Sequence, residues 1–339
     1  MIHELKEIIR QVLLNQKNGF KSVLATVVDL DGSSYRGPGV RMLISETGSM
    51  TGAVSGGCVE KEIRRQAESV FKSGQAVIMT YDGRLRLGCE GMLYILLEPI
   101  HIDETFLKAF SDCLKNRNGF GIRSYYQKKD GARGNFGSMV HFNENTCYSL
   151  SEKFESTSIE DLNMFEQFLV PCFKLWLIGG EHDAVKLCTI AAHLGWEVDI
   201  VTSLKDPKEL ANFPGAKNVI SASPQTLQFD EIDDQTAVVL MTHNYSMDLQ
   251  YLLAMKDCKP AYLGMLGSSK RRDRLENDLF EYAPDLNDSF LEHIHSPAGL
   301  NIGAETPEEI AISILSEILS ITRDKEPYSL KRITTKIHS

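Results

Sequence analysis

The amino-acid sequence predicts an α/β protein with two domains, a mixed α+β domain followed by one built on a parallel sheet. The second half alternates short apolar strands with amphipathic helices, which is typical of a parallel sheet with right-handed crossovers. The first hundred residues instead place several strands in succession, separated by short glycine-containing turns. The length of 339 residues suffices for about two such domains.

The first domain opens with the stretch MIHELKEIIRQVLLNQ, which predicts an amphipathic helix and not a signal peptide. A second helix is predicted from Val59 onward, because Ile63 and Ala67 continue one apolar face. The strands expected around these helices are 23–29, 40–45, 49–54, 76–81 and 92–98. The expected parts of the chain are a first domain at 1–150 (core about 10–100, mixed segment 101–150), a linker at 151–173, a second domain at 174–325 and a tail at 326–339.

The second domain begins with a buried strand at 175–178 and a helix at 184–194. Its last helix, at 308–319, follows Thr306-Pro307, which supply an N-cap and a proline at the first helical position. Ligands of parallel sheets bind outside the carboxyl ends of the strands, so we expect a site at that edge. Further strands are expected at 198–201, 218–220, 237–241 and 261–263.

Composition excludes several classes of function. A formal net charge of -10 argues against nonspecific nucleic-acid binding. The sequence has no run of about 18 apolar residues, so no membrane span is expected. Seven cysteines without a CxxC pair fit a reducing cytoplasm better than a disulfide framework or a zinc ribbon. We therefore expect a cytoplasmic protein with free thiols.

The stretch GAVSGGCVEKEI raises a question about Cys58. We expect Ser55 to be the N-cap of the following helix, and Gly56 and Gly57 to let the backbone approach a ligand. Cys58 would then lie among free N–H groups, which stabilise anions and lower the pKa of a thiol. A buried structural cysteine after a tight turn explains the same residues equally well.

The first turn of the second domain departs from the dinucleotide fingerprint. That fingerprint requires a second glycine where this chain has Glu181, and a carboxylate there would repel a diphosphate. The next strand ends at Thr202, where an acidic residue normally binds the ribose. The sequence therefore predicts a Rossmann-like scaffold with little or no affinity for NAD.

Two other loops carry polar side chains to the expected functional edge. His243 follows the strand at 237–241 and serves as a proton donor, a ligand contact or a helix cap. The residues at 267–270 lead into a basic helix, where serine hydroxyls, N–H groups and a lysine could form a phosphate cradle. A solvated basic helix face is the alternative, and we prefer it for Arg272 and Arg274.

The chain resembles the XdhC/CoxI family of accessory proteins for molybdenum hydroxylases such as xanthine dehydrogenase. The resemblance rests on the stretches GSSYRGPGVRMLI, GAVSGGCVEKEI, MTHNYSMDLQYL with YLGMLGSSKRR, and SPAGLNIGAETPEEIAISILSEI, which span both halves. It implies an N-terminal XdhC/CoxI domain and a C-terminal Rossmann-like domain. It also implies a chaperone that carries molybdenum cofactor, supports its sulfuration by a cysteine desulfurase and delivers it to an apo molybdenum hydroxylase.

Departures from the family pattern occur at four places. His182 is kept beside Glu181, the second strand ends in Thr202, Tyr35 precedes the retained Arg36, and Glu90 follows Cys89. These departures are compatible with a role as cofactor carrier, but they argue against nucleotide binding by the Rossmann-like domain.

The cofactor is an anionic pterin with sulfur-bound molybdenum, for which thiolate is a suitable soft ligand. We hypothesise that Cys58 faces the metal and that arginines neutralise oxyanions. A core role for Cys89 is an equal alternative. The candidate cofactor-binding residues are Arg36, Arg41, Gly56, Gly57, Cys58, Cys89, His182, His243, Gly267, Ser268, Ser269 and Lys270.

Two other classes of function remain as alternatives. A catalytic xanthine dehydrogenase subunit is disfavoured, because the chain lacks a four-cysteine iron–sulfur pattern and an intact dinucleotide fingerprint. A nucleotide-using transferase or sensor on the same scaffold is the other. We expect a cofactor chaperone more than a catalyst, and a homodimer is a further expectation without a sequence motif behind it.

Overall fold

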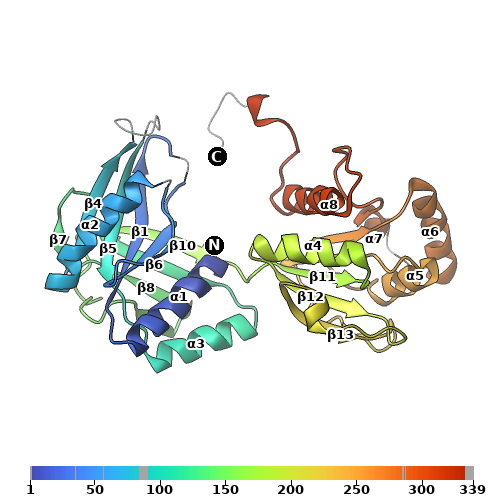
Figure 1. Ribbon diagram of the computed structural model, residues 1–339, viewed down its shortest axis with the longest axis horizontal. Coiled ribbons are helices and arrows are strands. Elements are labelled where there is room, and N and C mark those ends of the chain that lie inside the picture. Colours follow the sequence, from blue (N-terminus) through green and yellow to red (C-terminus); the bar gives the residue numbers. More distant parts are fainter. Residues whose placement is uncertain are drawn as a thin grey trace. The chain divides into compact units, whose positions relative to one another are not determined.

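The computed structural model describes residues 2–34, 36–55, 57–83, 91–284, 286 and 288–332, with the backbone alone at Cys58, Ser269, Glu276, Asp288 and Ser289. The chain forms two compact units, residues 1–171 and 172–339. Figure 1 labels the helices and strands of both. Each unit is described by itself below.

Unit 1 contains three helices and ten strands among its described residues. They are α1 (Ile2–Lys17), β1 (Ser22–Asp31), β2 (Arg41–Ser45), β3 (Met50–Gly52), α2 (Cys58–Ser73), β4 (Ala76–Asp82), β5 (Met92–Pro99), α3 (Glu104–Lys115), β6 (Phe120–Tyr126), β7 (Arg133–Gly134), β8 (Gly137–Asn143), β9 (Thr146–Ser149) and β10 (Asn163–Leu169). The helices and strands predicted for the first hundred residues are confirmed, with bounds that differ by at most two residues.

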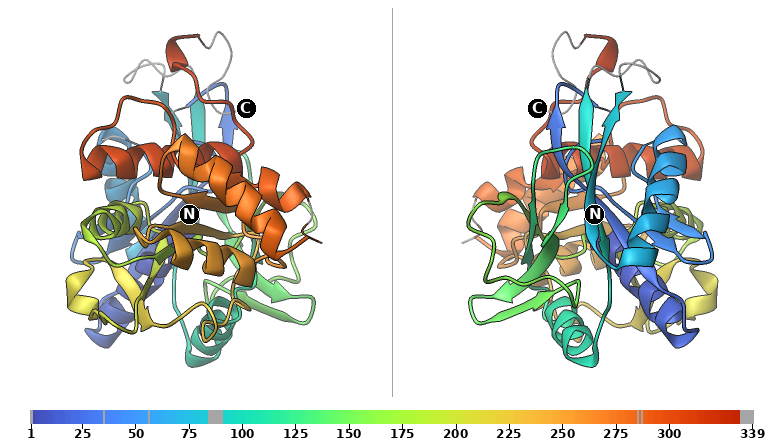
Figure 2. Two further views of the ribbon diagram at one scale, coloured as in Figure 1. Left: turned by 90° about the vertical axis from the view of Figure 1, so that its right-hand side faces the viewer. Right: turned by 90° about the vertical axis from the view of Figure 1, so that its left-hand side faces the viewer.

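Sheet A is antiparallel, with strand order β3-β2-β1-β5-β4-β7. α2 covers one of its faces, as the right-hand view of Figure 2 shows. The core on this side joins Val59, Ile63 and Ala67 of α2 to apolar residues of β1, β2, β4 and β5 such as Met42 and Ile44. Side chains alternate between the faces of a strand, so the residues between these point to the other side of the sheet.

Sheet B is also antiparallel, with strand order β10-β6-β8-β9. It faces the other side of sheet A, because Tyr126 of β6 packs with Ile78 and Leu96 in one buried cluster. Residues 163–169, which the sequence analysis assigned to a linker, form β10 and pair with β6 along their whole length. β10 is an edge strand whose side chains are mostly exposed or half-buried, and its sequence NMFEQFL lacks the strict alternation of apolar and polar residues that marks a half-buried strand.

Unit 2 contains five α-helices and six strands among its described residues. They are β11 (Lys174–Ile178), α4 (His182–His193), β12 (Glu197–Thr202), η2 (Leu210–Asn212), β13 (Ala216–Ser221), β14 (Thr236–Leu240), α5 (Tyr245–Ala254), β15 (Tyr262–Met265), α6 (Ser269–Tyr282), α7 (Asp288–Glu292), β16 (Ile294–His295), α8 (Pro307–Thr322) and the short η3 (Leu330–Arg332).

Sheet C is parallel throughout, with strand order β13-β12-β11-β14-β15-β16, which confirms the predicted Rossmann-like architecture. α4 and α8 pack on one face and α5 and α6 on the other. The left-hand view of Figure 2 shows α5 and α6 in orange. The predicted cap of α8 is confirmed, because the Thr306 hydroxyl accepts a hydrogen bond from the Glu309 N–H.

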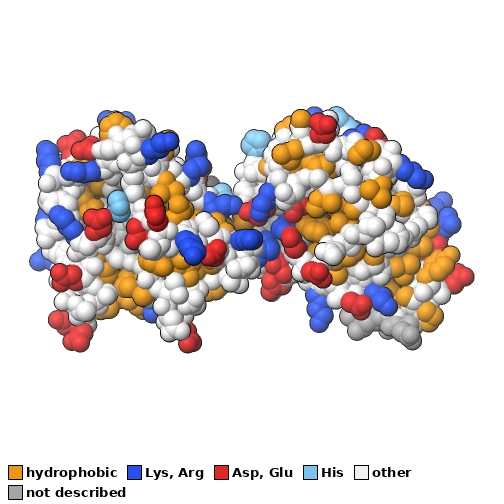
Figure 3. All heavy atoms as spheres, turned by 90° about the horizontal axis from the view of Figure 1, so that it is seen from below, with side chains coloured by type: hydrophobic (Ala, Val, Ile, Leu, Met, Phe, Trp, Pro, Cys, Tyr) orange, Lys and Arg blue, Asp and Glu red, His pale blue; other side chains and the backbone are white. Residues whose placement is uncertain are grey.

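The surface of both units is mixed in charge. On the face shown in Figure 3, basic and acidic side chains are interspersed over each unit, and exposed apolar side chains gather on unit 2. None of the helices in the described ranges combines the length and the apolar character that crossing a membrane requires. The described residues also contain no group of three His, Cys, Asp or Glu side chains arranged to hold a metal ion.

Candidate functional site

The start of α2 is formed by a glycine turn. The N-cap is Gly57 and not Ser55, so the predicted cap is wrong by two residues. Gly57 has φ 111°, a conformation that side-chain-bearing residues rarely adopt. The turn therefore requires glycine at this position, and it places Cys58 as the first residue of the helix.

The carboxylate of Glu60 folds back over this turn. It accepts hydrogen bonds from the N–H groups of Val54 (3.1 Å), Ser55 (2.6 Å) and Gly57 (2.6 Å). Burial raises the pKa of Glu60, but the backbone hydrogen bonds outweigh burial and lower this pKa below its ordinary value. Three N–H groups of the turn in front of Cys58 are thus bound to the chain's own carboxylate and are not free for an anion.

Arg36 lies beside this turn. Its Nη1 donates a hydrogen bond to the Ala53 carbonyl (2.8 Å) and lies 3.9 Å from the Glu4 carboxylate. The guanidinium side chain is 38% exposed, so part of it remains available to solvent. The structure therefore brings Arg36 close to the segment that leads into Cys58.

Arg41 does not join this group. It is buried in β2 and points away from the face that Met42 and Ile44 present to α2. Its Nη1 donates to the Gly39 carbonyl and to Gln167 of β10, and its Nε and Nη2 have no hydrogen-bond partner among the described residues. Burial lowers the pKa of Arg41 to about 10. The prediction that this arginine neutralises cofactor oxyanions beside α2 conflicts with this position between the two sheets.

Gly56, Cys89 and the side chain of Cys58 lie outside the described residues. Their predicted roles in cofactor binding remain predictions.

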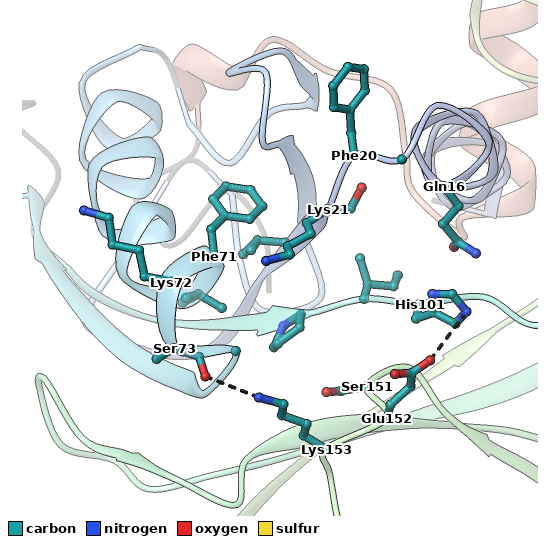
Figure 4. Close-up of a pocket in the computed structure, with 17 residues that line it drawn as sticks. Gln16, Phe20, Lys21, Phe71, Lys72, Ser73, His101, Ser151, Glu152 and Lys153 are labelled. Atoms are coloured by element: carbon teal, nitrogen blue, oxygen red, sulfur yellow. Dashed lines mark hydrogen bonds and ion pairs between the residues drawn. The ribbon is translucent and has the colours of Figure 1, made fainter.

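A cavity of about 450 Å³ lies at the other end of α2 (Figure 4). Lys153 Nζ donates to the Ser73 carbonyl there (3.3 Å), and His101 Nε2 lies 3.5 Å from the Glu152 carboxylate. α2 has 16 residues, so the cavity is about 24 Å along the helix from Cys58. None of the predicted site residues lines this cavity.

In unit 2 the β11–α4 turn and the end of β14 meet closely. A Cβ on Gly179 would come 2.3 Å from the Met241 carbonyl oxygen, so only glycine fits. His243 adopts φ 54°, and its Nε2 lies 3.7 Å from the carboxylate of Asp183. His182, the exposed first residue of α4, precedes Asp183. The two predicted histidines thus stand on adjacent loops of one edge.

The start of α6 contains the predicted phosphate cradle. Ser268 is the N-cap, but its side chain does not cap the helix, and Lys270 is exposed. Gly267 lies against Arg271, whose guanidinium is bound to the buried carboxylate of Asp248. Residues 267–270 line neither the cavity at the end of α2 nor the one at the carboxyl edge of sheet C.

Asp248 links α5 and α6 to the end of β14. Its carboxylate accepts a hydrogen bond from Thr242 Oγ1 (2.5 Å) in addition to that of Arg271. Burial raises the pKa of Asp248, against the effect of these partners. The sequence analysis treated Arg271 only as part of a basic helix. A strand and a loop separate Asp248 from Arg271 in the sequence, so no local sequence pattern indicates that the two residues pair.

A cavity of about 370 Å³ opens at the carboxyl edge of sheet C. It is lined by the β11–α4 turn, the ends of β12 and β14, the segment after β13 and one side of α5, and we call it the edge cavity. None of the candidate cofactor-binding residues lines the edge cavity. Glu181 and Thr202, the two departures from the dinucleotide fingerprint, do line it. The sequence analysis did not select Ser203 and Lys205 as candidates, although the sequence places them after the second strand of the sheet, at the edge where ligands bind.

Comparison with known proteins matches both units. The XdhC and CoxI family matches residues 16–82, and the XdhC Rossmann domain matches residues 175–318. A crystal structure described as that of a xanthine dehydrogenase from Bacillus halodurans has a TM-score of 0.76 at 27% sequence identity, covering 95% of this chain and 97% of that one.

Two relatives are similar over nearly their whole length. The molybdenum cofactor insertion chaperone PaoD of Escherichia coli (strain K12) is 27% identical over 326 residues, covering 95% of this chain and 90% of the relative. A protein of Bacillus subtilis (strain 168) named as a probable xanthine dehydrogenase subunit is 30% identical over 321 residues, covering 88% of this chain and 92% of the relative. The chain therefore belongs to the XdhC and CoxI family.

Proposed function

We propose that this protein is an accessory factor that binds molybdenum cofactor as cargo, supports its sulfuration and inserts it into a molybdenum hydroxylase of the xanthine dehydrogenase type. The observation that carries the proposal is the similarity, across both units, to a relative named a molybdenum cofactor insertion chaperone. The similarity to a relative named a probable xanthine dehydrogenase subunit supports the class of client enzyme.

The start of α2 supports a restricted form of the cofactor hypothesis. Glu60 already binds the amides of Val54, Ser55 and Gly57 and adds a negative charge there, so we assign the cargo's oxyanions to a cation and not to an amide nest. The half-exposed Arg36 supplies that cation, and the thiol of Cys58 supplies a soft ligand for molybdenum. The cargo phosphate is assigned to residues 267–270, with exposed Lys270 as its counter-charge.

The test is the cofactor content of the protein purified from molybdate-fed cells. Cys58→Ala should lose most of the bound molybdenum and pterin, whereas Cys147→Ala, which removes an exposed thiol from β9, should retain them. Circular dichroism checks that both variants are folded. Equal cofactor content in a folded Cys58→Ala protein would reject the assigned role of this thiol, and absence of pterin from the wild type would reject the cargo.

The proposed desulfurase partner is tested separately. Incubation with a cysteine desulfurase and cysteine should transfer one sulfur from cysteine, which becomes alanine, to a protein thiol as a persulfide or to the molybdenum of the bound cofactor. Mass spectrometry tells these two apart, because a persulfide stays on the denatured chain, whereas sulfur on molybdenum is seen only in the mass of the native complex. No added sulfur on either would remove the desulfurase from the proposal.

The remaining parts of the proposal concern catalysis, assembly and compartment. The purified chain should not oxidise xanthine without a client enzyme, and a spectrophotometric assay with an artificial electron acceptor measures this. A homodimer is tested by light scattering, and the cytoplasmic compartment by cell fractionation.

A further inference from the structure

The edge cavity has no role in the proposed function, yet it has the position and composition of a ligand site. It opens where ligands of parallel sheets bind, outside the carboxyl ends of β11, β12 and β14. Its volume of about 370 Å³ is near the lower end of the range for small-molecule pockets, roughly 300–1,000 Å³. It therefore suits a molecule of mononucleotide size better than a complete dinucleotide.

The start of α4, beside the edge cavity, carries two carboxylates. Glu181 is the N-cap of α4 and lines the cavity, and Asp183 lies in the first turn of the same helix. Two carboxylates at the positive end of a helix dipole offset the attraction that this end exerts on anions. A phosphate at the start of α4, where a dinucleotide places its diphosphate, would meet both of them.

The segment after β12 brings both lysines and a carboxylate to the edge cavity, because Lys205, Asp206 and Lys208 all line it. Thr202 ends β12, and its hydroxyl is bonded to Ser221 at 3.0 Å. Lys208 is paired with Asp206 at 2.6 Å, whereas Lys205 lines the cavity and makes no ion pair with a described residue. In this fold an acidic residue at the end of the second strand binds a ribose 2′-hydroxyl, and a cation there accommodates a 2′-phosphate.

The apolar part of the edge cavity is suited to a planar base. Ala222 and Tyr251 are buried, and with Met247 they form apolar walls. Gln225 and Gln250 come from different segments, and their side-chain amides are bonded to each other at 2.9 Å. Amide groups at the mouth of an apolar slot provide both donors and acceptors for the edge of a heterocycle.

We propose that the edge cavity binds a purine nucleotide phosphorylated on the 2′-hydroxyl of its ribose, with the phosphate on Lys205 and the base between α5 and the segment after β13. The carboxylates of Glu181 and Asp183 disfavour a phosphate at the first turn of α4, whereas Lys205 after β12 offers a cation that makes no ion pair with a described residue. The proposal is independent of the molybdenum cargo, because it uses residues of unit 2 to which no cofactor role is assigned.

Isothermal titration calorimetry of the full-length protein tests this orientation. Adenosine 2′-monophosphate should bind at least about tenfold more tightly than adenosine 5′-monophosphate, since only the former directs a phosphate to Lys205. NADP⁺ should likewise bind more tightly than NAD⁺. Equal affinities within either pair, or no binding of adenosine 2′-monophosphate, would overturn the proposal.

Three variants, one of which is a control, locate the charges. Lys205→Met should weaken binding of adenosine 2′-monophosphate at least about tenfold. Lys259→Met, which removes an exposed lysine ahead of β15 at the amino edge of the sheet, should leave it unchanged. Glu181→Gln should strengthen binding of NADP⁺ about fivefold, because it removes a carboxylate facing the diphosphate. An equal loss in both lysine variants would contradict a specific site.

The pterin cofactor also carries a phosphate and a planar heterocycle, so it is a second source of the same chemistry. Lys205→Met purified from molybdate-fed cells should retain the wild-type content of pterin and molybdenum. Loss of that content, with unchanged nucleotide affinity, would assign the edge cavity to the cargo and overturn the nucleotide proposal while leaving the proposed function intact.

Discussion

At the scale of single residues, the buried polar pair between sheets A and B of unit 1 is an unusual feature. Glu98 is fully buried and accepts hydrogen bonds from the N–H (2.8 Å) and the hydroxyl (2.5 Å) of Ser138. Burial raises the pKa of Glu98 from 4.5 to about 7, although Ser138 and the charge of Arg41 act in the opposite direction. The carboxyl group therefore takes up a proton more readily in the folded protein than in the unfolded chain.

This raised pKa predicts a dependence of stability on pH. Between pH 4.5 and about 7 the folded protein binds a proton at Glu98 that the unfolded chain has released, so the stabilisation present below pH 4.5 is lost as the pH rises through this window. The slope is at most about 1.4 kcal/mol per pH unit. In urea unfolding followed by circular dichroism, the wild type should lose up to about 2 kcal/mol more than Glu98→Gln between pH 5 and pH 7. The same loss in both proteins would contradict the assignment.

At the scale of secondary-structure elements, the attachment of α6 depends on one buried ion pair. The Asp248 side chain is 1% exposed and its partner Arg271 22% exposed, whereas the neighbouring Arg272 is 45% exposed. Removing the partner of a buried charge is far more costly than removing an exposed charge, because the remaining carboxylate is left unpaired in the interior.

We therefore expect Arg271→Met to lower the free energy of unfolding of unit 2 by about 3 kcal/mol. Arg272→Met on the same helix should lower it by less than about 1 kcal/mol. Both tryptophans, Trp176 and Trp196, belong to unit 2, so tryptophan fluorescence during urea unfolding reports this unit. Comparable effects of the two substitutions would show that the Asp248 pair does not hold α6.

The elements themselves were largely predictable from sequence, but their pairings were not. The period of apolar residues located α2, and Thr306 with Pro307 marked the start of α8. β10 was missed, because its exposed edge position removes the alternating apolar pattern. The N-cap of α2 was misplaced by two residues, because the turn is capped by the returning carboxylate of Glu60 rather than by the Ser55 hydroxyl.

At the scale of the whole molecule, each unit has its own hydrophobic core. The clusters on sheet A involve residues of unit 1 alone, and those on sheet C residues of unit 2 alone. Units with separate cores are expected to unfold as separate cooperative transitions.

A substitution in unit 1 tests this independence. Gly57→Ala forces a side chain into a backbone conformation with φ 111°, at a cost of about 1–3 kcal/mol. No atom outside its immediate neighbours lies within 4 Å of the added Cβ, so strain and not a clash is responsible. The change should shift the transition seen by circular dichroism and leave that of tryptophan fluorescence in place. A parallel shift of both signals would show that the two units unfold together.

The sequence alone determined the succession of strands and helices, the parallel sheet of the second unit and the resemblance to one family, because these depend on periodicity and motifs among neighbouring residues. Only the tertiary structure decided that Arg41 is buried between two sheets, that Glu60 occupies the turn before Cys58, and that a cavity lined by both Glu181 and Lys205 opens at the edge of sheet C. These outcomes depend on which groups far apart in the chain come into hydrogen-bonding or ionic contact. No local pattern encodes such contacts, since a polar side chain is suited to many partners and packing selects among them.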